Sequence, residues 1–280
     1  MTHAERIRRH ARPLDPIPAS LGVKLSPLTG IKSVVFDIYG TLIISGTGDI
    51  GLVAEASKGE AMADSFRALG IAPPAGGLAE RFDALIRAAQ DRRRQDGIEY
   101  PEVEIREVWR ALAGEAVPDA LIEPLAIEYE CRTNPVWPMP HLAESLANLR
   151  ARDLRLGIVS NAQFYTPHLF PALLGESLEA LGFAPDDQIY SYELREGKPS
   201  TALYERLAAR FDPAATLYIG NDLLKDIWPA QRTGFRTALF AGDARSLRLR
   251  EGDPRVADTT PDIVVTDLRQ IADCLAGAPR

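Results

Sequence analysis

The sequence predicts an α/β protein with a doubly wound parallel sheet into which a helical segment is inserted. Short β-branched runs alternate with amphipathic helices from about residue 136 onward, and one further apolar run lies at 31–37. The intervening residues have helical periodicity and no strand-like run. Strands that alternate with helices form right-handed crossovers and a parallel sheet. We therefore expect an N-terminal arm over 1–30, a core over 31–47 and 136–280, and a helical insertion over 48–135.

The first thirty residues contain many turn formers after a charged start, namely Pro13, Pro16, Pro18, Gly22, Pro27 and Gly30. This pattern favours an arm that lies on the surface or is partly disordered, rather than a core element. Residues 31–37 follow as a short apolar, β-branched run between Gly30 and Gly40. Such a run is typical of a strand that is buried on both faces of a parallel sheet.

The remaining elements are predicted from hydrophobic periodicity. In the insertion, helices are expected at 61–69, 78–90, 103–112 and 121–129, and the last is followed by a proline-rich hinge at 134–140. In the core, we expect helices at 141–152, 173–181, 201–211, 224–233 and 268–275, with strands at 154–160, 188–191, 216–219, 236–240 and 263–265. The order predicts that the core is interrupted once, after its first strand.

The composition argues against several classes of function. The formal net charge of −7 argues against wrapping of nucleic acid or binding to an anionic membrane, so small-molecule chemistry is expected. No apolar run is long enough for a transmembrane helix, and the first ten residues lack the apolar middle of a secretion signal, so we expect a cytoplasmic protein. Cys131 and Cys274 lie far apart and are expected to be buried thiols.

Polar side chains recur where the predicted strands end. Asp37 ends the first strand, Ser160 and Asn161 end the second, and Lys198 follows the third; Asn221, Asp222 and Asp226 follow the fourth. Ligands of open α/β sheets bind beyond the carboxyl ends of the strands, so these groups are expected to gather there. Magnesium would explain the gathering of carboxylates, with Asp37 and Asp222 as its protein ligands. Lys198 would keep Asp37 ionised, because a nearby positive charge lowers a carboxyl pKa.

In these positions the chain resembles the haloacid dehalogenase-like hydrolase superfamily. Residues 34–42 (VVFDIYGTL) look like its first motif, Ser160-Asn161 like its second, Lys198-Pro199 like its third and residues 220–226 (GNDLLKD) like its acidic fourth. The resemblance covers about residues 31–270. It implies a Rossmann-like core, with the helical insertion as a cap that closes over the site and selects the substrate.

The resemblance also implies a role for each matching residue. Asp37 is the nucleophile and forms a covalent ester or acyl phosphate, and Lys198 is the second catalytic residue. The substrate-binding residues are Tyr39, Thr41, Ser160 and Asn161. The ligands of Mg²⁺ are Asp37, the backbone carbonyl of Tyr39, Asn221, Asp222 and Asp226.

Two departures from the family pattern point to different activities. Tyr39 stands where phosphatases of the superfamily have a second aspartate, and a phenol is a poor base near neutral pH, so this position favours a 2-haloacid dehalogenase, which needs no metal. Tyr204 also fits the dehalogenase pattern, although a core tyrosine explains it equally well. The acidic fourth motif favours a metal-dependent phosphatase instead, even though Asn221 replaces its usual first aspartate.

We favour a Mg²⁺-dependent phosphatase of small phosphomonoesters that acts through an aspartyl phosphate. The alternative is a metal-independent 2-haloacid dehalogenase with an aspartyl ester. Another hydrolase of the superfamily and a non-catalytic small-molecule-binding protein are further alternatives. The substrate is expected to be an anionic small molecule.

Overall fold

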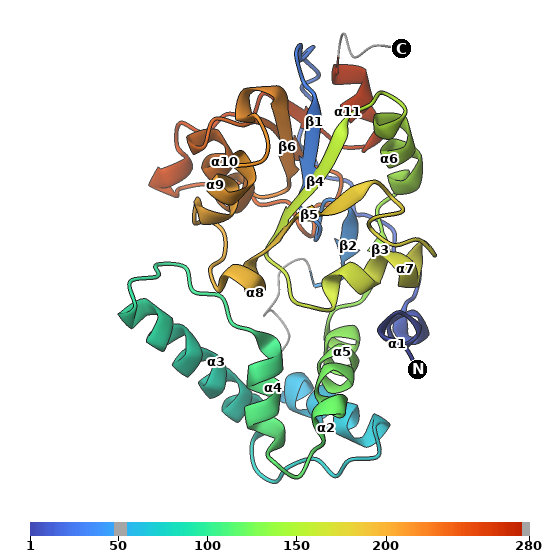
Figure 1. Ribbon diagram of the computed structural model, residues 1–280, viewed down its shortest axis with the longest axis vertical. Helices are drawn as coiled ribbons and strands as arrows, with labels where there is room; N and C mark the ends of the chain where they lie inside the picture. The colour runs from blue at the N-terminus through green and yellow to red at the C-terminus, as the bar shows by residue number, and fades with distance from the viewer. Residues whose placement is uncertain (48–54, 276–280) are drawn as a thin grey trace.

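A six-stranded parallel sheet forms the core of the computed structural model (Figure 1), which describes residues 1–47 and 55–275. Its order is β5–β4–β1–β6–β7–β8. The strands are β1 (Ser33–Phe36), β4 (Arg155–Ser160), β5 (Phe183–Tyr190), β6 (Thr216–Gly220), β7 (Arg236–Phe240) and β8 (Ile263–Val265). In the centre, Phe36 of β1 is paired with Ile158 of β4 and Ile219 of β6. The predicted doubly wound α/β fold is therefore confirmed.

Helices cover both faces of the sheet because β1 has apolar side chains on both sides. Val34 and Phe36 belong to one buried cluster, together with side chains of α6 and α11, whereas Val35 packs with Leu203 and Tyr204 of α9 in another. The core helices are α6 (Leu142–Arg150), α7 (Leu169–Leu173), α8 (Ser191–Leu194), α9 (Ala202–Ala208), α10 (Trp228–Arg232) and α11 (Arg269–Cys274). Short 3₁₀ turns occur at Thr166–His168, Pro213–Ala215 and Pro254–Val256.

The inserted segment forms a separate helical layer beyond one edge of the core (Figure 1). It contains α2 (Glu55–Ala68), α3 (Leu78–Gln95), α4 (Ile105–Ala113), a 3₁₀ turn (Asp119–Leu121) and α5 (Ile122–Thr133), so all four predicted helices are present. Trp109 of α4 is fully buried and its ring contacts those of Phe66, Phe82 and Tyr129. These aromatic contacts join the helices into the cap.

An antiparallel ribbon carries the chain between core and cap. It consists of β2 (Ile43–Ser45) and β3 (Val136–Pro138), with Ser45 opposite Val136. Neither strand was predicted from the sequence, because three residues are too few to show an alternating pattern. The predicted proline-rich hinge coincides with β3.

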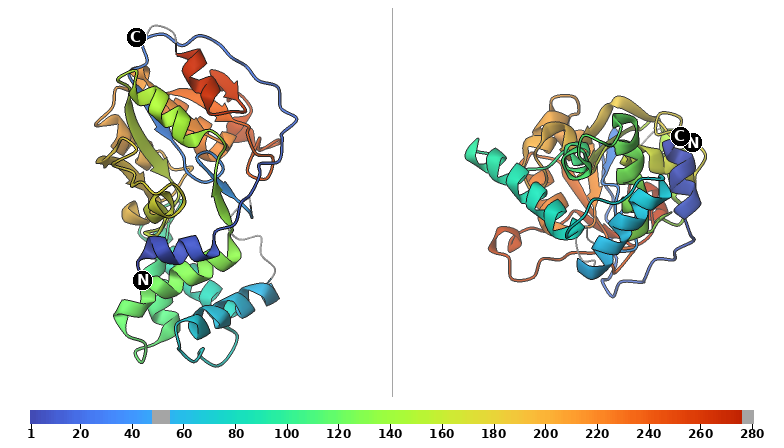
Figure 2. Two further views of the ribbon diagram at one scale, coloured as in Figure 1. Left: turned by 90° about the vertical axis from the view of Figure 1, so that its right-hand side faces the viewer. Right: turned by 90° about the horizontal axis from the view of Figure 1, so that it is seen from below.

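The N-terminal segment, expected to lie on the surface or to be partly disordered, contains a helix and two buried apolar residues. Residues 3–10 form α1 (His3–His10), which begins with a capping box between Thr2 and Glu5 and packs on α5 and α7. The chain then runs along the core to β1 (Figure 2), where Lys24 pairs with Val264 and Leu28 is buried. Ile7 is also buried. α1 was not predicted because it contains only two apolar residues, Ala4 and Ile7, which are too few to show a periodic pattern.

Other boundaries differ for local reasons. The helix expected at 173–181 is absent: α7 ends at Leu173, and Gly175 follows with φ +79°, a conformation that favours glycine. The strand expected at 188–191 begins earlier, at Phe183, with an irregular register against β4. The helix expected at 224–233 starts as a π-helix, η4 (Leu223–Ile227), before α10. Both cysteines are free thiols, with Cys274 buried and Cys131 partly buried.

Within residues 1–47 and 55–275, every helix is too short or too polar to cross a lipid bilayer.

Candidate functional site

Asp37 lies directly after the central strand β1, where a tight turn exposes its carboxylate to a cavity. Its backbone N–H donates to the carbonyl of Ile219, which extends the β1–β6 pairing by one residue. Gly40 then turns the chain with φ +82°. A Cβ atom at Gly40 would lie 2.5 Å from the Cβ of Ser246, so glycine is required both for the backbone conformation and for the space.

Lys198 holds the Asp37 carboxylate. Its Nζ lies 2.7 Å from Oδ1 of Asp37, 2.6 Å from Oδ1 of Asp226 and 3.0 Å from the hydroxyl of Tyr218. Lys198 is only 6% exposed. Burial acts to lower the pKa of Lys198, but the charges of Asp226 and Asp37 outweigh it, so the pKa is raised. The ammonium group therefore stays charged between the two carboxylates.

Asp226 is fixed on its other side by the backbone. Its Oδ2 accepts hydrogen bonds from the N–H groups of Asn221 and Asp222, each at 3.0 Å. The hydroxyl of Tyr218 donates to Oδ1 at 2.9 Å. Burial raises the pKa of Asp226 to about 6, against the opposing charge of Lys198. A Cβ at Gly220 would lie 2.3 Å from Cγ of Asp226, so glycine is needed for this close approach.

Asn161 and Thr41 position other parts of the site. The side-chain oxygen of Asn161 accepts from the backbone N–H of Lys198 at 2.8 Å, and its amide nitrogen donates to the carbonyl of the same residue at 3.3 Å. Thr41 is fully buried, and its hydroxyl donates to Oδ1 of Asn221 at 3.2 Å. Ser160 is also fully buried, and its hydroxyl has no hydrogen-bond partner within the described chain. Of the predicted substrate-binding residues, Tyr39 and Asn161 line the cavity, whereas Thr41 and Ser160 do not.

The predicted magnesium ligands do not form a metal site in this geometry. Oδ1 of Asp222 caps the next helical turn by accepting from the N–H groups of Leu224 and Lys225, and Arg250 forms a two-pronged ion pair with the same carboxylate. Both oxygens of Asp226 accept hydrogen bonds, Oδ1 from Lys198 and Oδ2 from the backbone of Asn221. Oδ1 of Asn221 accepts from the hydroxyl of Thr41.

The other two predicted magnesium ligands are Asp37 and the backbone carbonyl of Tyr39. Across the described ranges, no group of three or more His, Cys, Asp or Glu side chains is arranged to hold a metal ion. Magnesium usually binds to one or two carboxylates together with substrate oxygens and water. Because Asn221, Asp222 and Asp226 already have protein partners, the predicted set is not arranged as a preformed magnesium site, and the roles expected from the fourth motif stay predictions.

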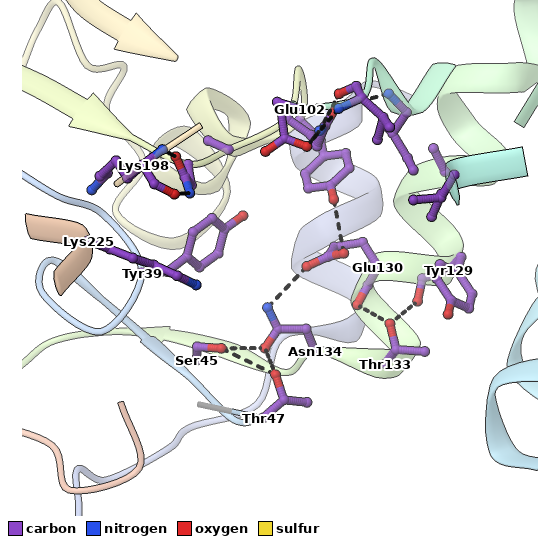
Figure 3. Close-up of a pocket in the computed structure, with 18 of the residues that line it drawn as sticks. Tyr39, Ser45, Thr47, Glu102, Tyr129, Glu130, Thr133, Asn134, Lys198 and Lys225 are labelled. Atoms are coloured by element: carbon purple, nitrogen blue, oxygen red, sulfur yellow. Dashed lines mark hydrogen bonds between the residues drawn. The ribbon is translucent and has the colours of Figure 1, made fainter. Parts of the chain in front are cut away.

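A cavity of about 540 Å³ lies between core and cap, with Asp37 and Lys198 in its core wall. Its cap wall includes Phe82, Trp109 and Tyr129. Tyr39 extends from the side of Lys198 towards the cap (Figure 3), and its hydroxyl lies 3.1 Å from that of Thr166. Burial and the nearby charge of Glu130 raise the pKa of Tyr39 well above its ordinary value. Tyr39 is therefore a neutral phenol and cannot act as a general base.

Several residues of the site were missed by sequence reasoning. Tyr218 joins the Lys198 network from the middle of β6, and its only sequence signal is a position two residues before the motif glycine, Gly220. Glu130 and Tyr165 line the cavity from α5 and from the loop after β4. No motif marks them, because the packing of the cap on the core brings them there. Tyr204 is a core tyrosine, fully buried, with its hydroxyl donating to the carbonyl of Lys225.

Comparisons with known proteins agree with this geometry. The model of the haloacid dehalogenase-like hydrolase family matches residues 31–234. The chain belongs to the haloacid dehalogenase-like hydrolases. The family match spans β1, the cap and the segments that contain Lys198 and Asp226, so the predicted family and the hydrolase class are confirmed.

Relatives within the family differ in activity. The glyceraldehyde 3-phosphate phosphatase of Methanocaldococcus jannaschii is 26% identical over 168 residues, which are 59% of this chain and 68% of the relative. A 2-haloacid dehalogenase from Pseudomonas syringae pv. Tomato is 21% identical, with a TM-score of 0.56 over 88% of this chain and 98% of that structure. A phosphatase of the same family from Thermococcus onnurineus is 20% identical, with a TM-score of 0.54 over 88% and 99%. The solved structures support the fold of a capped haloacid dehalogenase-like hydrolase.

Proposed function

We propose that this haloacid dehalogenase-like hydrolase acts without a metal ion, through a covalent ester on Asp37, and that its substrates are small 2-haloacids. One observation carries this proposal. Asp37 faces the cavity and is held by Lys198, whereas Asp222 and Asp226, the carboxylates expected to bind magnesium, are engaged by Arg250 and Lys198.

The first step follows from the position of Asp37. One carboxylate oxygen attacks the halogen-bearing carbon, the carbon–halogen bond breaks, and the halide leaves with the bonding electron pair. A halide needs no proton when it leaves, so the neutral phenol of Tyr39 does not hinder this step. Lys198 holds Oδ1 and so directs the carboxylate.

The substrate is proposed to be anionic. Lys58 and Arg248 line the same cavity as Lys198, and their positive charges favour an anionic occupant. A 2-haloacid has the required negative charge. We propose no nucleic-acid or membrane partner.

A phosphatase is the second candidate, and the similarity to the archaeal glyceraldehyde 3-phosphate phosphatase favours it. In that case Asp37 would attack phosphorus, and an alkoxide leaving group would need a proton that Tyr39 does not readily supply. Phosphate-ester hydrolysis thus needs a proton donor that displacement of a halide does not need.

Two probes separate the candidates. We expect chloride release from 2-chloropropionate that is unchanged by EDTA and little or no hydrolysis of 4-nitrophenyl phosphate. Phosphate release that requires added Mg²⁺ and stops with EDTA would overturn the metal-free proposal and support the second candidate.

Substitution Asp37→Asn tests the nucleophile itself. We expect turnover to fall by at least about 10⁴-fold, because removal of a catalytic nucleophile costs about that much or more. Lys198 keeps its ion pair with Asp226 in this variant, so the variant should still fold and unfold cooperatively on heating. A folded D37N protein with undiminished turnover would mean that Asp37 is not the nucleophile.

A further inference from the structure

The link between α3 and α4 contacts the core at the loops that hold Lys198. Residues 100–105 of this link, here called the docking segment, belong to the cap and lead into α4. They pass close to α8 (Figure 1). On the core side they contact two loops, residues 161–163 after β4 and residues 195–198 after α8. The cap is therefore attached to the core beside the site, in addition to the ribbon.

The backbone of the docking segment pairs with the second of these loops as antiparallel strands do. The N–H of Gly197 donates to the carbonyl of Tyr100 at 2.8 Å, and the N–H of Glu102 donates to the carbonyl of Arg195 at 3.1 Å. Lys198 comes directly after Gly197. The cap is thus hydrogen-bonded to the chain one residue before the ammonium group of the site.

Gln163 holds the docking segment from the first loop. Its Nε2 donates to the carbonyl of Val103 at 2.9 Å, and its Oε1 accepts from the N–H of Ile105 at 3.0 Å. Asn161, two residues earlier, makes an equivalent pair of bonds to the backbone of Lys198. One loop of the core therefore holds the cap with one amide side chain and Lys198 with another.

Two charged side chains add contacts across the same boundary. Glu102 accepts from the hydroxyl of Ser191, the first residue of α8, at 3.0 Å. Arg195 follows α8 with φ +57°, a left-handed conformation that a residue other than glycine rarely adopts without support. Its guanidinium forms a two-pronged pair with Glu107 of α4, at 2.7 and 3.0 Å. The cap therefore helps to hold the loop that precedes Lys198 in its shape.

Lys198 has little freedom to compensate for a displaced loop. Its side chain is almost fully buried, and its Nζ contacts oxygen atoms of Asp37, Asp226 and Tyr218. A shift of its backbone would change the bond to Oδ1 of Asp37, and with it the direction of the carboxylate that faces the cavity.

We propose that Gln163 and Arg195 are positioning residues for the attack by Asp37. They dock residues 100–105 against the two loops that hold Lys198, and this docking keeps Nζ of Lys198 on Oδ1 of Asp37. Both residues act through Lys198, without contact with the reacting atoms. The inference rests on the proposed function, because it takes Asp37 to be the nucleophile. The cap then does more than enclose the cavity, since it helps to align the carboxylate that reacts.

The first test is the release of the first chloride from 2-chloropropionate by Gln163→Ala, which loses both bonds to the docking segment. We expect the maximal rate to fall by about 10- to 100-fold, the size of effect that follows a displacement of about 1 Å in an active site. The substrate concentration at half-maximal rate should change by less than about threefold. A rise in this concentration with an unchanged maximal rate would overturn the proposal, because the cap would then only enclose the substrate.

The second test asks whether Gln163 acts through Lys198. In a Lys198→Met background, Gln163→Ala should slow the first chloride by less than about a further twofold, because the ammonium group that docking aligns is absent. Effects that multiply would overturn the proposal. If K198M does not fold or releases no chloride, Arg195→Ala takes its place in the comparison. The combined Q163A and R195A effects should then be smaller than their product, and independent effects would overturn the proposal.

Gln231→Ala is the matched control. Gln231 is a glutamine of the core that lies outside the cavity, and its amide donates to the hydroxyl of Thr237 and the carbonyl of Thr260. The variant loses hydrogen bonds of a similar kind, and both kinetic parameters should stay within about twofold of wild type. An effect as large as that of Gln163→Ala would overturn the proposal, because loss of any such bond would then slow the reaction.

These outcomes differ from those that bear on the proposed function. Release of the first chloride by a folded Q163A protein at the wild-type rate would overturn the role of Gln163 while leaving Asp37 as the nucleophile. Full turnover of D37N would remove the proposed function itself. If phosphate esters prove to be the substrates, release of 4-nitrophenol from 4-nitrophenyl phosphate replaces chloride release, and the same comparisons apply.

Discussion

Glu128 and Glu130 lie two residues apart on α5 and have opposite environments. Glu128 faces α1, where its carboxylate pairs with Arg6 at 2.5 Å, His10 at 2.9 Å and Arg132 at 3.3 Å. Glu130 faces the cavity, and its donors among the described residues are neutral. Burial acts to raise both pKa values, but the hydrogen bonds from His10 and Arg6 outweigh it at Glu128 and lower its pKa to about 2.

The difference shows how one helix serves two purposes. A carboxylate surrounded by cations stabilises the fold and has little capacity left for chemistry. A carboxylate held by neutral donors keeps free acceptor positions, and burial raises its pKa. We therefore expect substitutions on the two faces to separate stability from turnover.

The largest effect is expected in the core wall, where Asp37 and Asp226 share one cation. Lys198→Met would leave two buried carboxylates with no neutralising charge. Because removal of one partner of a buried ion pair costs about 3–5 kcal/mol, we expect a loss of that size in the free energy of unfolding. Urea denaturation measures it. A loss of less than about 1 kcal/mol would show that water reaches the carboxylates in the folded protein.

Glu128→Gln is expected to lower the free energy of unfolding by about 3 kcal/mol, because Arg6 is then buried without its partner. Turnover of the folded protein should stay within about threefold of wild type, since Glu128 faces away from the cavity. Denaturation and steady-state kinetics on the same preparation check both points. Slower turnover with an unchanged unfolding free energy would contradict the assignment of the two faces.

Acid should remove the same contribution in the wild-type protein. The pKa of Glu128 is lower in the folded state, about 2, than its ordinary value of 4.5, so its stabilisation is present above pH 4.5 and is lost as the pH falls towards 2. The loss should amount to roughly 2–3 kcal/mol. The difference in unfolding free energy between wild type and E128Q should therefore shrink over this range. A constant difference from pH 5 to pH 2 would be inconsistent with the ion pairs at Glu128.

The smallest effect is expected on the outer surface of the cap. Asp64 and Arg67 of α2 form an exposed pair three residues apart, at 2.7 Å. Such pairs contribute less than about 0.5 kcal/mol, so Asp64→Asn should change the free energy of unfolding by less than this. The measurement provides the baseline for the two larger substitutions of α5 and the core.

The core wall could be predicted from the sequence and the cap wall could not. Asp37, Asn161, Lys198 and Asp226 follow strands of one parallel sheet, and strand order brings such positions together whatever the details of packing. The partners of Asp222 could not be predicted, because Arg250 lies in a loop after β7 whose path follows no periodic pattern.

Glu130 shows the same limit on the cap side. Its helix was predicted, but the sequence does not fix which of its faces meets the core. That choice depends on the ribbon and on α1, neither of which was predicted as an ordered element. Hydrophobic periodicity identifies a helix, while its neighbours decide where each polar side chain points.

The ribbon of β2 and β3 allows the cap to be deleted without interrupting the six-stranded sheet. Since Ser45 and Val136 are directly paired, the chain leaves the core and returns to it at adjacent points. A short turn that joins these two residues would close the ribbon as an ordinary hairpin, and the six-stranded sheet would lose none of its strands. Asp37, Lys198 and Asp226 would stay in one chain with their sheet, whereas Glu130 would leave with the cap. Exchange of caps between relatives would therefore change one wall of the cavity while the proposed nucleophile stays the same.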